Sequence, residues 1–296
     1  MTKTVSIHSF RAGTGKANIS ANTAAQFALQ GNRVGVIDID IPAPGTHTLF
    51  GIKENDIDKT LNDYLWGRCA IEDTAYDVSA QVGGGKVEAA GGGIYLIPSS
   101  NRIGEITRML RDGYDVGLLN DGLRTIAAKL DLDYLFIDTH PGLNEETLLS
   151  IAISDLLIIV LRPDQQDFQG TAVTVDVARK LNIPHLYIVV NKVPFTQYDF
   201  VAELERHASE EIRQQVEEIA VFFKERQQQE KEKHLQQIKD MRQQIEKTYN
   251  APVIAILPLS QDVARVQSAD LFSIRIPDHP YSKGIRDIAA AIKATE

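Results

Sequence analysis

The chain of 296 residues is 43% hydrophobic and 24% charged, which is the balance of a globular protein and excludes a disordered chain. Lys and Arg number 31 and Asp and Glu number 40, so the net charge of −9 disfavours a nucleic-acid coat and non-specific DNA binding. The single cysteine, Cys69, excludes an intrachain disulfide. No apolar run approaches the ~18 residues of a membrane span, and the polar start is not a secretory signal, so we expect a cytoplasmic protein.

Short apolar runs alternate with longer amphipathic stretches along the chain. In chain order we expect a strand at 4–9, a helix at 18–30, a strand at 33–38, a glycine-rich loop at 83–93, a strand at 94–98, helices at 103–110 and 116–130, a strand at 134–138, a helix at 144–153, a strand at 156–161, a helix at 172–181, strands at 186–191 and 253–258, and a helix at 281–294. The strands are continuous Ile, Val and Leu runs, which is typical of a parallel sheet covered by helices on both faces. This alternation predicts a doubly wound, mostly parallel α/β fold in one domain, residues 1–296.

One region departs from this pattern. Residues 201–250 contain no Gly and no Pro, and they carry 11 acidic and 9 basic residues. A single crossover helix between the last two strands needs only about 12 to 15 residues, so roughly 30 residues are surplus. The region is therefore expected to be an insertion.

The apolar residues of the insertion have helical spacing on both sides of residues 224–234, a stretch that has no apolar residue. We therefore expect a charged hairpin of two antiparallel helices over residues 201–249, with its turn near 227–231. Two roles are open for it, a docking arm for a dimer mate or a protein partner and a solvated ornament.

The first strand is followed by a candidate phosphate loop, FRAGTGKAN at residues 10–18. A strand, a glycine turn, a lysine and a helix N-terminus in this order form an anion site, because backbone N–H groups and the helix dipole favour a negative charge. The strict pattern G-x-x-x-x-G-K-[ST] is broken by Phe10 in place of its first Gly and by Ala17 in place of its Ser or Thr. An ordinary glycine turn is the alternative on spacing alone.

Carboxylates follow two of the other expected strands. Asp38 and Asp40 end the second strand, and Asp138 ends the strand at 134–138. The carboxyl ends of parallel strands meet at one edge of the sheet, and carboxylates there hold Mg²⁺ or position a water. Together with the loop, they predict a magnesium–nucleotide site.

With these motifs the chain resembles the MinD/ParA family of P-loop ATPases, which have a deviant Walker A loop K-G-G-x-G-K-[ST]. Residues 11–17 align with that loop without gaps, and VIDIDIPAPG at 36–45, FIDTHPG at 136–142 and VVNKVP at 189–194 agree in order and spacing. The resemblance covers nearly the whole chain except the insertion. It implies a P-loop nucleotide-binding fold that takes ATP or ADP with Mg²⁺ and forms a homodimer when ATP is bound.

The resemblance also implies site residues. Three residues would be catalytic: Lys16 would bind phosphate, Asp40 would orient the attacking water, and Arg11 would be the third. Asp38 and Asp138 would lie at the magnesium. The other positions implied to contact nucleotide are Gly13, Thr14, Gly15, Ala17, Asn18, Gly142, Asn191 and Pro258. The Gly142 amide would sense the γ-phosphate, Asn191 would contact the adenine edge and Pro258 would lie near the base.

The loop departs from the family at three positions. Arg11 replaces the family's signature Lys, which reaches across the dimer, and it keeps the charge. Ala12 replaces a Gly, which requires a negative φ. Ala17 lacks the hydroxyl that is normally a magnesium ligand, so we expect weak or impaired hydrolysis.

The resulting expectation is an ATP-binding dimeric switch that positions or regulates a larger cellular assembly. The alternative is a non-hydrolysing nucleotide-binding scaffold that acts through its helical insertion. A single cysteine disfavours an iron–sulfur cluster, and Cys69 is expected to be a small buried residue. The apolar face of the last helix is expected to pack on the sheet rather than on a membrane. His8 is expected in the strand and His140 as a structural or exposed residue.

Overall fold

The computed structural model describes residues 2–194, 213–266 and 269–295. The chain divides into two compact units, one made of Met1–Val193 with Pro252–Glu296 and the other of Pro194–Ala251. Within the described ranges, no helix has the length and apolar content that crossing a membrane requires.

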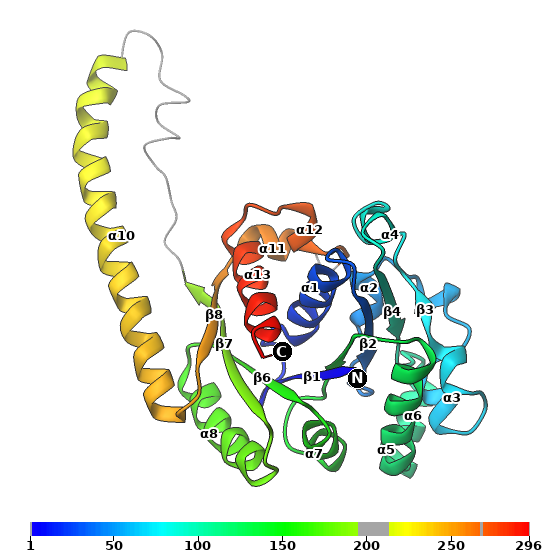
Figure 1. Ribbon diagram of the computed structural model, residues 1–296. Coiled ribbons are helices and arrows are strands. Elements are labelled where there is room, and N and C mark those ends of the chain that lie inside the picture. Colours follow the sequence, from blue (N-terminus) through cyan, green and yellow to red (C-terminus); the bar gives the residue numbers. More distant parts are fainter. Residues whose placement is uncertain (1, 195–212, 267–268, 296) are drawn as a thin grey trace. The chain divides into compact units, whose positions relative to one another are not determined.

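The first unit is built on an eight-stranded sheet (Figure 1). Its strands are β1 (Lys3–His8), β2 (Arg33–Asp38), β3 (Tyr76–Asp77), β4 (Gly93–Ile97), β5 (Tyr134–Asp138), β6 (Leu156–Leu161), β7 (His185–Pro194) and β8 (Val253–Leu259). They lie in the order β3-β4-β2-β5-β1-β6-β7-β8. The pairs from β4 to β7 are parallel, and β3 pairs antiparallel with β4. The predicted doubly wound, mostly parallel fold is confirmed.

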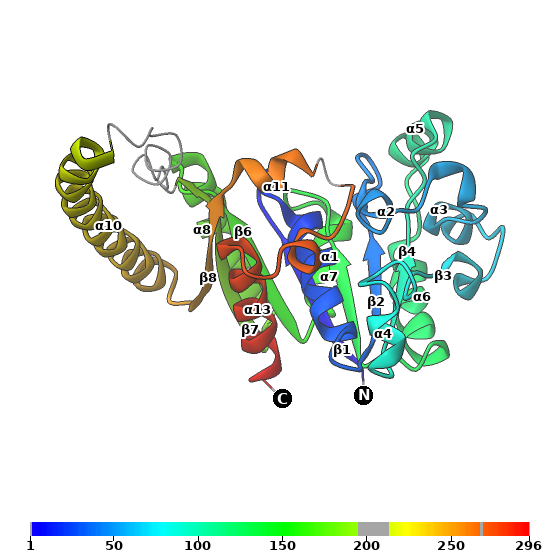
Figure 2. The ribbon, with the colours of Figure 1, turned by 90° about the horizontal axis from the view of Figure 1, so that it is seen from above.

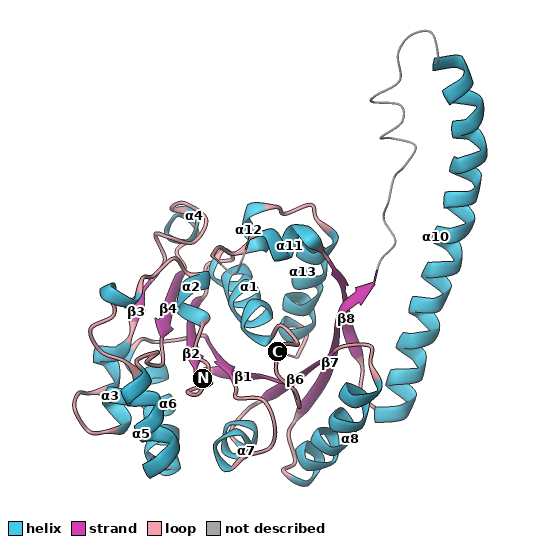
Figure 3. Ribbon diagram, turned by 180° about the vertical axis from the view of Figure 1, so that it is seen from behind, coloured by secondary structure: helices cyan, strands magenta, loops and turns pink. Residues whose placement is uncertain are grey.

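Helices cover both faces of this sheet (Figures 1 and 3). One face carries α1 (Lys16–Ala28), α2 (Thr46–Leu49), α12 (Phe272–Arg275) and α13 (Pro280–Lys293), with α1 and α13 side by side (Figure 2). The other face carries α3 (Leu61–Leu65), α5 (Ile103–Asp112), α6 (Val116–Lys129), α7 (Glu145–Ala152) and α8 (Gln165–Lys180). The short elements η1 (Glu54–Asp56), η2 (Ile71–Thr74), α4 (Lys86–Ala89) and α11 (Gln261–Arg265) connect them.

The two-sided core follows from the period of two along each strand. In β5, Tyr134 and Phe136 join the cluster under α1 and α13, whereas Leu135 and Ile137 join the cluster under α3, α5 and α6. The Phe27 ring of α1 lies 4.3 Å from the Tyr134 ring, centroid to centroid. Both faces bury apolar side chains, so the strands read as continuous apolar runs rather than alternating ones. The apolar face of α13 is buried as expected.

In the second unit, α10 (Arg213–Tyr249) is one continuous helix of 37 residues. The turn that we expected at 227–231 is therefore wrong. Glu, Lys, Arg and Gln are strong helix formers, so a polar stretch without Gly or Pro does not end a helix. The remaining part of the expected hairpin, residues 201–212, lies outside the described residues.

Three smaller expectations also change. α8 begins at Gln165, seven residues before the predicted start, because the Asp164 side chain caps it by accepting from the Asp167 N–H at 2.9 Å. The glycine-rich loop at 83–93 contains the short helix α4. Cys69 is partly exposed rather than buried.

Candidate functional site: a phosphate loop at the carboxyl edge of the sheet

The loop between β1 and α1 depends on glycine at two positions. Gly13 has a φ of 76° and Gly15 a φ of 97°, both in the left-handed region that favours glycine. A Cβ atom on Gly15 would also lie 2.5 Å from Asn191 Nδ2. Lys16 is the first residue of α1 and is 7% exposed. The loop thus places an ammonium group at a helix N-terminus, where an anion is favoured.

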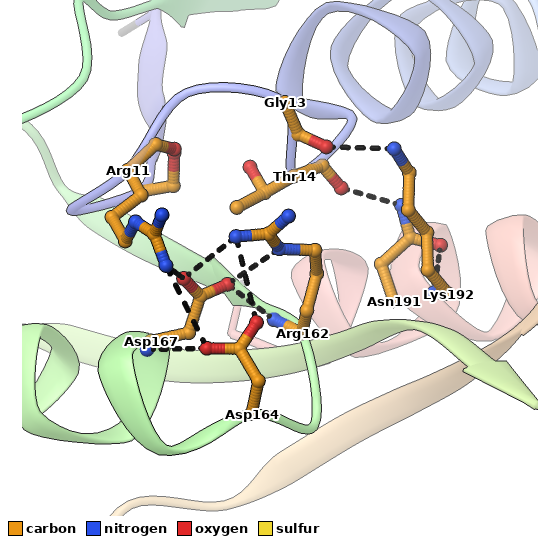
Figure 4. A network of polar contacts seen from close by, with 9 residues as sticks. Arg11, Gly13, Thr14, Arg162, Asp164, Asp167, Asn191 and Lys192 are labelled. Atoms are coloured by element: carbon orange, nitrogen blue, oxygen red, sulfur yellow. Dashed lines mark hydrogen bonds and ion pairs between the residues drawn. The ribbon is translucent and has the colours of Figure 1, made fainter.

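Two residues near the carboxyl end of β7 hold one side of the loop (Figure 4). Asn191 Nδ2 donates to the Thr14 carbonyl at 2.7 Å, and Lys192 Nζ donates to the Gly13 carbonyl at 2.7 Å. Asn191 Oδ1 accepts from the Lys192 backbone N–H at 2.8 Å. In this state Asn191 braces the loop, so its predicted contact with adenine stays a prediction. Pro258 is buried near the carboxyl end of β8.

The first turn of α8 holds the other side. Phe10 packs against Gly170, where a side chain would collide with the Phe10 ring. The Arg11 guanidinium lies 3.8 Å from an Asp164 oxygen and 3.7 Å from an Asp167 oxygen (Figure 4). Both departures of the loop, Phe10 and Arg11, therefore have partners on α8. The sequence marks Phe10 and Arg11 only as departures from the loop pattern, because their partners on α8 are far away in sequence.

Asp167 is the centre of this ion-pair network. Arg162 donates to it through Nε at 2.9 Å and through an Nη at 3.1 Å. Burial acts to raise the pKa of Asp167, but the hydrogen bonds from Arg162 outweigh it and hold the pKa below its ordinary value. Asp167 is therefore a stable anion that can pair with Arg11.

Asp38 and Asp138 are neighbours in the register of β2 and β5. Burial raises the pKa of Asp38, although both of its oxygens accept backbone N–H groups. Its Oδ1 accepts from Asp40 at 3.0 Å, and its Oδ2 accepts from Gly45 at 3.0 Å and Thr46 at 3.1 Å. Asp38 therefore shapes the loop that follows β2, and its predicted contact with magnesium stays a prediction.

Asp138 has the environment of a cation ligand. Its Oδ1 is buried without a hydrogen-bond partner among the described residues, and its Oδ2 accepts from the Thr46 hydroxyl at 3.3 Å. Burial, and then the charge of Asp38, raise its pKa well above the ordinary value. A divalent cation beside Asp138 would favour its ionised form and so act against this rise in pKa. Among the described residues no group of three or more His, Cys, Asp or Glu side chains could hold a metal.

Three further site residues lie around this edge. The Gly142 N–H, at a φ of 88°, donates to the Ser9 carbonyl at 3.2 Å, so its predicted contact with a γ-phosphate needs that bond to be exchanged. Asn18, in the first turn of α1, accepts from Asn22 Nδ2 at 2.8 Å through its carbonyl. Ala17 brings no hydroxyl to the site.

Two histidines lie at this edge of the sheet. His8 ends β1, is fully buried and contacts the Thr139 hydroxyl through Nδ1 at 2.8 Å. Burial and the charge of Lys16 lower its pKa to about 3, so it is neutral. His140, expected to be structural or exposed, is 28% exposed and contacts Asp40, with its Nδ1 2.7 Å from Asp40 Oδ1.

Comparison with known proteins shows a family and a set of similar folds. Residues 2–188 match a family model described as an AAA domain. An uncharacterized ATP-binding protein of Methanocaldococcus jannaschii is 28% identical over 189 residues, which are 64% of this chain and 64% of that protein. The flagellum site-determining protein YlxH of Helicobacter pylori is 27% identical over 192 residues, 65% of this chain and 58% of that protein. An iron–sulfur cluster carrier protein of Pyrococcus furiosus is 25% identical over 193 residues, 63% of this chain and 60% of that protein.

Solved structures share the fold over almost the entire chain. The cell division ATPase MinD of Pyrococcus furiosus superposes with a TM-score of 0.71 at 18% identity and covers 100% of both chains. The septum site-determining protein MinD of Pyrococcus horikoshii, complexed with Mg-ADP, has a TM-score of 0.68 at 18% identity and covers 99% of this chain and 96% of its own. The matched stretch spans less than two thirds of the length of the curated relatives, between 58% and 64%.

Proposed function

Because the chain belongs to the AAA domain family and has the MinD/ParA fold, we propose that it is an ATP-binding dimeric switch that positions or regulates a larger cellular assembly. The observation that carries the proposal is the glycine loop at the start of α1 beside the buried Asp138 Oδ1, which has no hydrogen-bond partner in the described part of the chain. Titration calorimetry with ATP and Mg²⁺ tests it. Binding that needs both components supports the proposal, and no binding would contradict it.

The chain's own residues supply positioning and charge in this proposal. Lys16 and the loop N–H groups would hold the phosphates, and Asp138 would hold the magnesium. Bound Mg²⁺ supplies neutralisation of the charge that develops on the phosphoryl oxygens. Asp40, which is partly exposed beside the site, orients the attacking water. The chemistry is phosphoryl transfer to water, in which positioning provides most of the catalysis.

Hydrolysis is proposed to be slow because Ala17 brings no hydroxyl to the metal. Ala17→Ser should raise phosphate release about tenfold or more, the range typical of a lost or regained partner at a metal site. Phosphate release with saturating ATP and Mg²⁺ measures this. Ala128→Ser, at an exposed position of α6, is the control. A parent protein that hydrolyses as fast as the Ala17→Ser variant would contradict the explanation.

Dimerisation is the second proposed step. The pairs that Arg11 makes with Asp164 and Asp167 are long and Arg11 is 41% exposed, so they are worth at most about 1 kcal/mol. Arg11 can therefore leave Asp164 and Asp167 for the phosphates of a second subunit at a small cost in free energy. Arg11→Ala should bind ATP yet remain monomeric in light scattering, whereas Arg124→Ala on α6 should behave as the parent. Equal parent masses with and without an ATP analogue would exclude the dimer.

The second candidate is the non-hydrolysing scaffold, and the observation that favours it is Ala17. In either case we propose that the unit Pro194–Ala251, with the helix α10, binds a protein partner. Carriage of an iron–sulfur cluster, which the names of several relatives suggest, is not proposed, because this chain has one cysteine and clusters are held by several. ATP that is bound but never hydrolysed, even by Ala17→Ser, would favour the scaffold.

A further inference from the structure

We propose that His140 is the positioning residue for Asp40: it binds one carboxylate oxygen and thereby directs the other toward the attacking water. The inference rests on the proposed ATPase function and deepens it. The contact is short, with 2.7 Å between His140 Nδ1 and Asp40 Oδ1. The two residues belong to loops that are 100 positions apart in sequence.

The register of the sheet brings the pair together. Asp38 lies opposite Asp138 in the parallel pair β2 and β5. Asp40 and His140 each follow two residues later, so they leave adjacent strands at the same level and at the same edge. This is the carboxyl edge, which also carries the phosphate loop.

The direction of the hydrogen bond follows from the chemistry of the two groups. A carboxylate oxygen accepts, so this contact is a hydrogen bond in the His140 tautomer that carries its hydrogen on Nδ1, with Nδ1–H donating to Asp40 Oδ1. A hydrogen bond to a charged group is among the stronger polar contacts in a protein. Among the residues that the structure describes, no donor is recorded for Asp40 Oδ2. Oδ2 is therefore the atom left to accept a proton from water.

Hydrogen bonds hold the backbones of Asp40 and His140 in place, so the contact between their side chains sets the orientation of the Asp40 carboxylate. The Asp40 N–H donates to Asp38 Oδ1 at 3.0 Å, and the Asp40 carbonyl accepts from the Ala43 N–H at 3.0 Å. The His140 carbonyl accepts from the Thr147 hydroxyl of α7 at 3.2 Å. What remains free is the rotation of the Asp40 carboxylate, and the His140 hydrogen bond restricts it.

The pair is also accessible, as a water-orienting group must be. The side chains of Asp40 and His140 are 16% and 28% exposed. His8 makes a useful contrast, since it is fully buried and contacts the Thr139 hydroxyl rather than a carboxylate. Of these two histidines, His140 is the one that contacts the proposed water-orienting carboxylate.

The test compares two substitutions of the same residue. His140→Leu removes the donor, whereas His140→Asn keeps an N–H donor close to the position of Nδ1. We expect His140→Leu to lower kcat about tenfold or more, the effect of losing a hydrogen bond to a charged group. KM and the calorimetric Kd for ATP should stay within about twofold, and His140→Asn should keep kcat within about threefold of the parent. His185→Leu, on β7 and away from the pair, is the control.

An independent readout does not need turnover. In ¹H–¹⁵N NMR the Nδ1–H resonance of His140 should be present in the parent protein and absent or shifted in Asp40→Ala. The inference is overturned if His140→Leu keeps the parent kcat, if His140→Asn is as slow as His140→Leu, or if the resonance ignores Asp40→Ala. These outcomes differ from a failure of the proposed function, in which Asp40→Ala itself releases phosphate as fast as the parent, a result that would overturn both.

Discussion

Asp40→Ala is expected to lower phosphate release about 100-fold or more while ATP binding stays close to that of the parent. The carboxylate is two residues beyond β2, its loop is fixed by Asp38, and it is partly exposed to water. Positioned groups that take or orient a proton in the transition state contribute about 10² to 10⁴ in rate. Alanine removes that group without touching the phosphate loop, so the effect belongs to kcat.

The measurement is steady-state phosphate release in parallel with calorimetry. Asp176→Ala, an exposed carboxylate on α8, is the matched control and should leave both quantities unchanged. If Asp40→Ala weakens ATP binding as much as it slows release, the residue acts in binding rather than in orienting water.

Lys16→Ala is expected to weaken ATP binding by about 1.5 to 3 kcal/mol, the usual worth of a hydrogen bond to a charged group. That corresponds to about 10- to 150-fold in Kd. Lys16 is 7% exposed at the start of α1, so water competes little with a phosphate for its ammonium group. The Lys16 charge also acts to lower the raised pKa of Asp138, so its loss leaves that buried carboxylate less well compensated.

Calorimetry with ATP and Mg²⁺ measures this effect, and thermal unfolding gives a second reading. Saturating ligand stabilises the parent in proportion to its affinity, by about 2.7 kcal/mol at 100 times Kd. Lys16→Ala should lose most of that stabilisation, whereas Lys180→Ala, which is exposed at the end of α8, should not. An unchanged Kd for ATP in Lys16→Ala would show that this loop is not the phosphate site.

The main strands and the helices of the first unit could be predicted because local patterns determine them. Continuous apolar runs identified β1, β2, β4, β5, β6, β7 and β8, since strands buried on both faces must be apolar throughout. The glycine loop, Lys16 and the strand-end carboxylates are likewise local signals. The elements between β2 and β4 had no periodic pattern long enough to predict them.

The helix α10 shows where a local argument misled. We predicted a turn near 227–231, within a stretch that has no apolar residue, because the chain must return to the sheet. Backbone hydrogen bonds within a helix do not require a packed face, and the residues there favour helix. The absence of Gly and Pro was the better signal.

The sequence by itself therefore determined the strands, the phosphate loop and the acidic residues at the strand ends, because each depends on neighbours in the chain. Only the tertiary structure decided which residues contact one another at the site. The strand order sets Asp40 beside His140, places Arg11 against Asp164 and Asp167 of α8, and brings Asn191 to the Thr14 carbonyl. These contacts join residues 100 to 177 positions apart, and no local propensity encodes such a distance, since it follows from which strands pair and in which register.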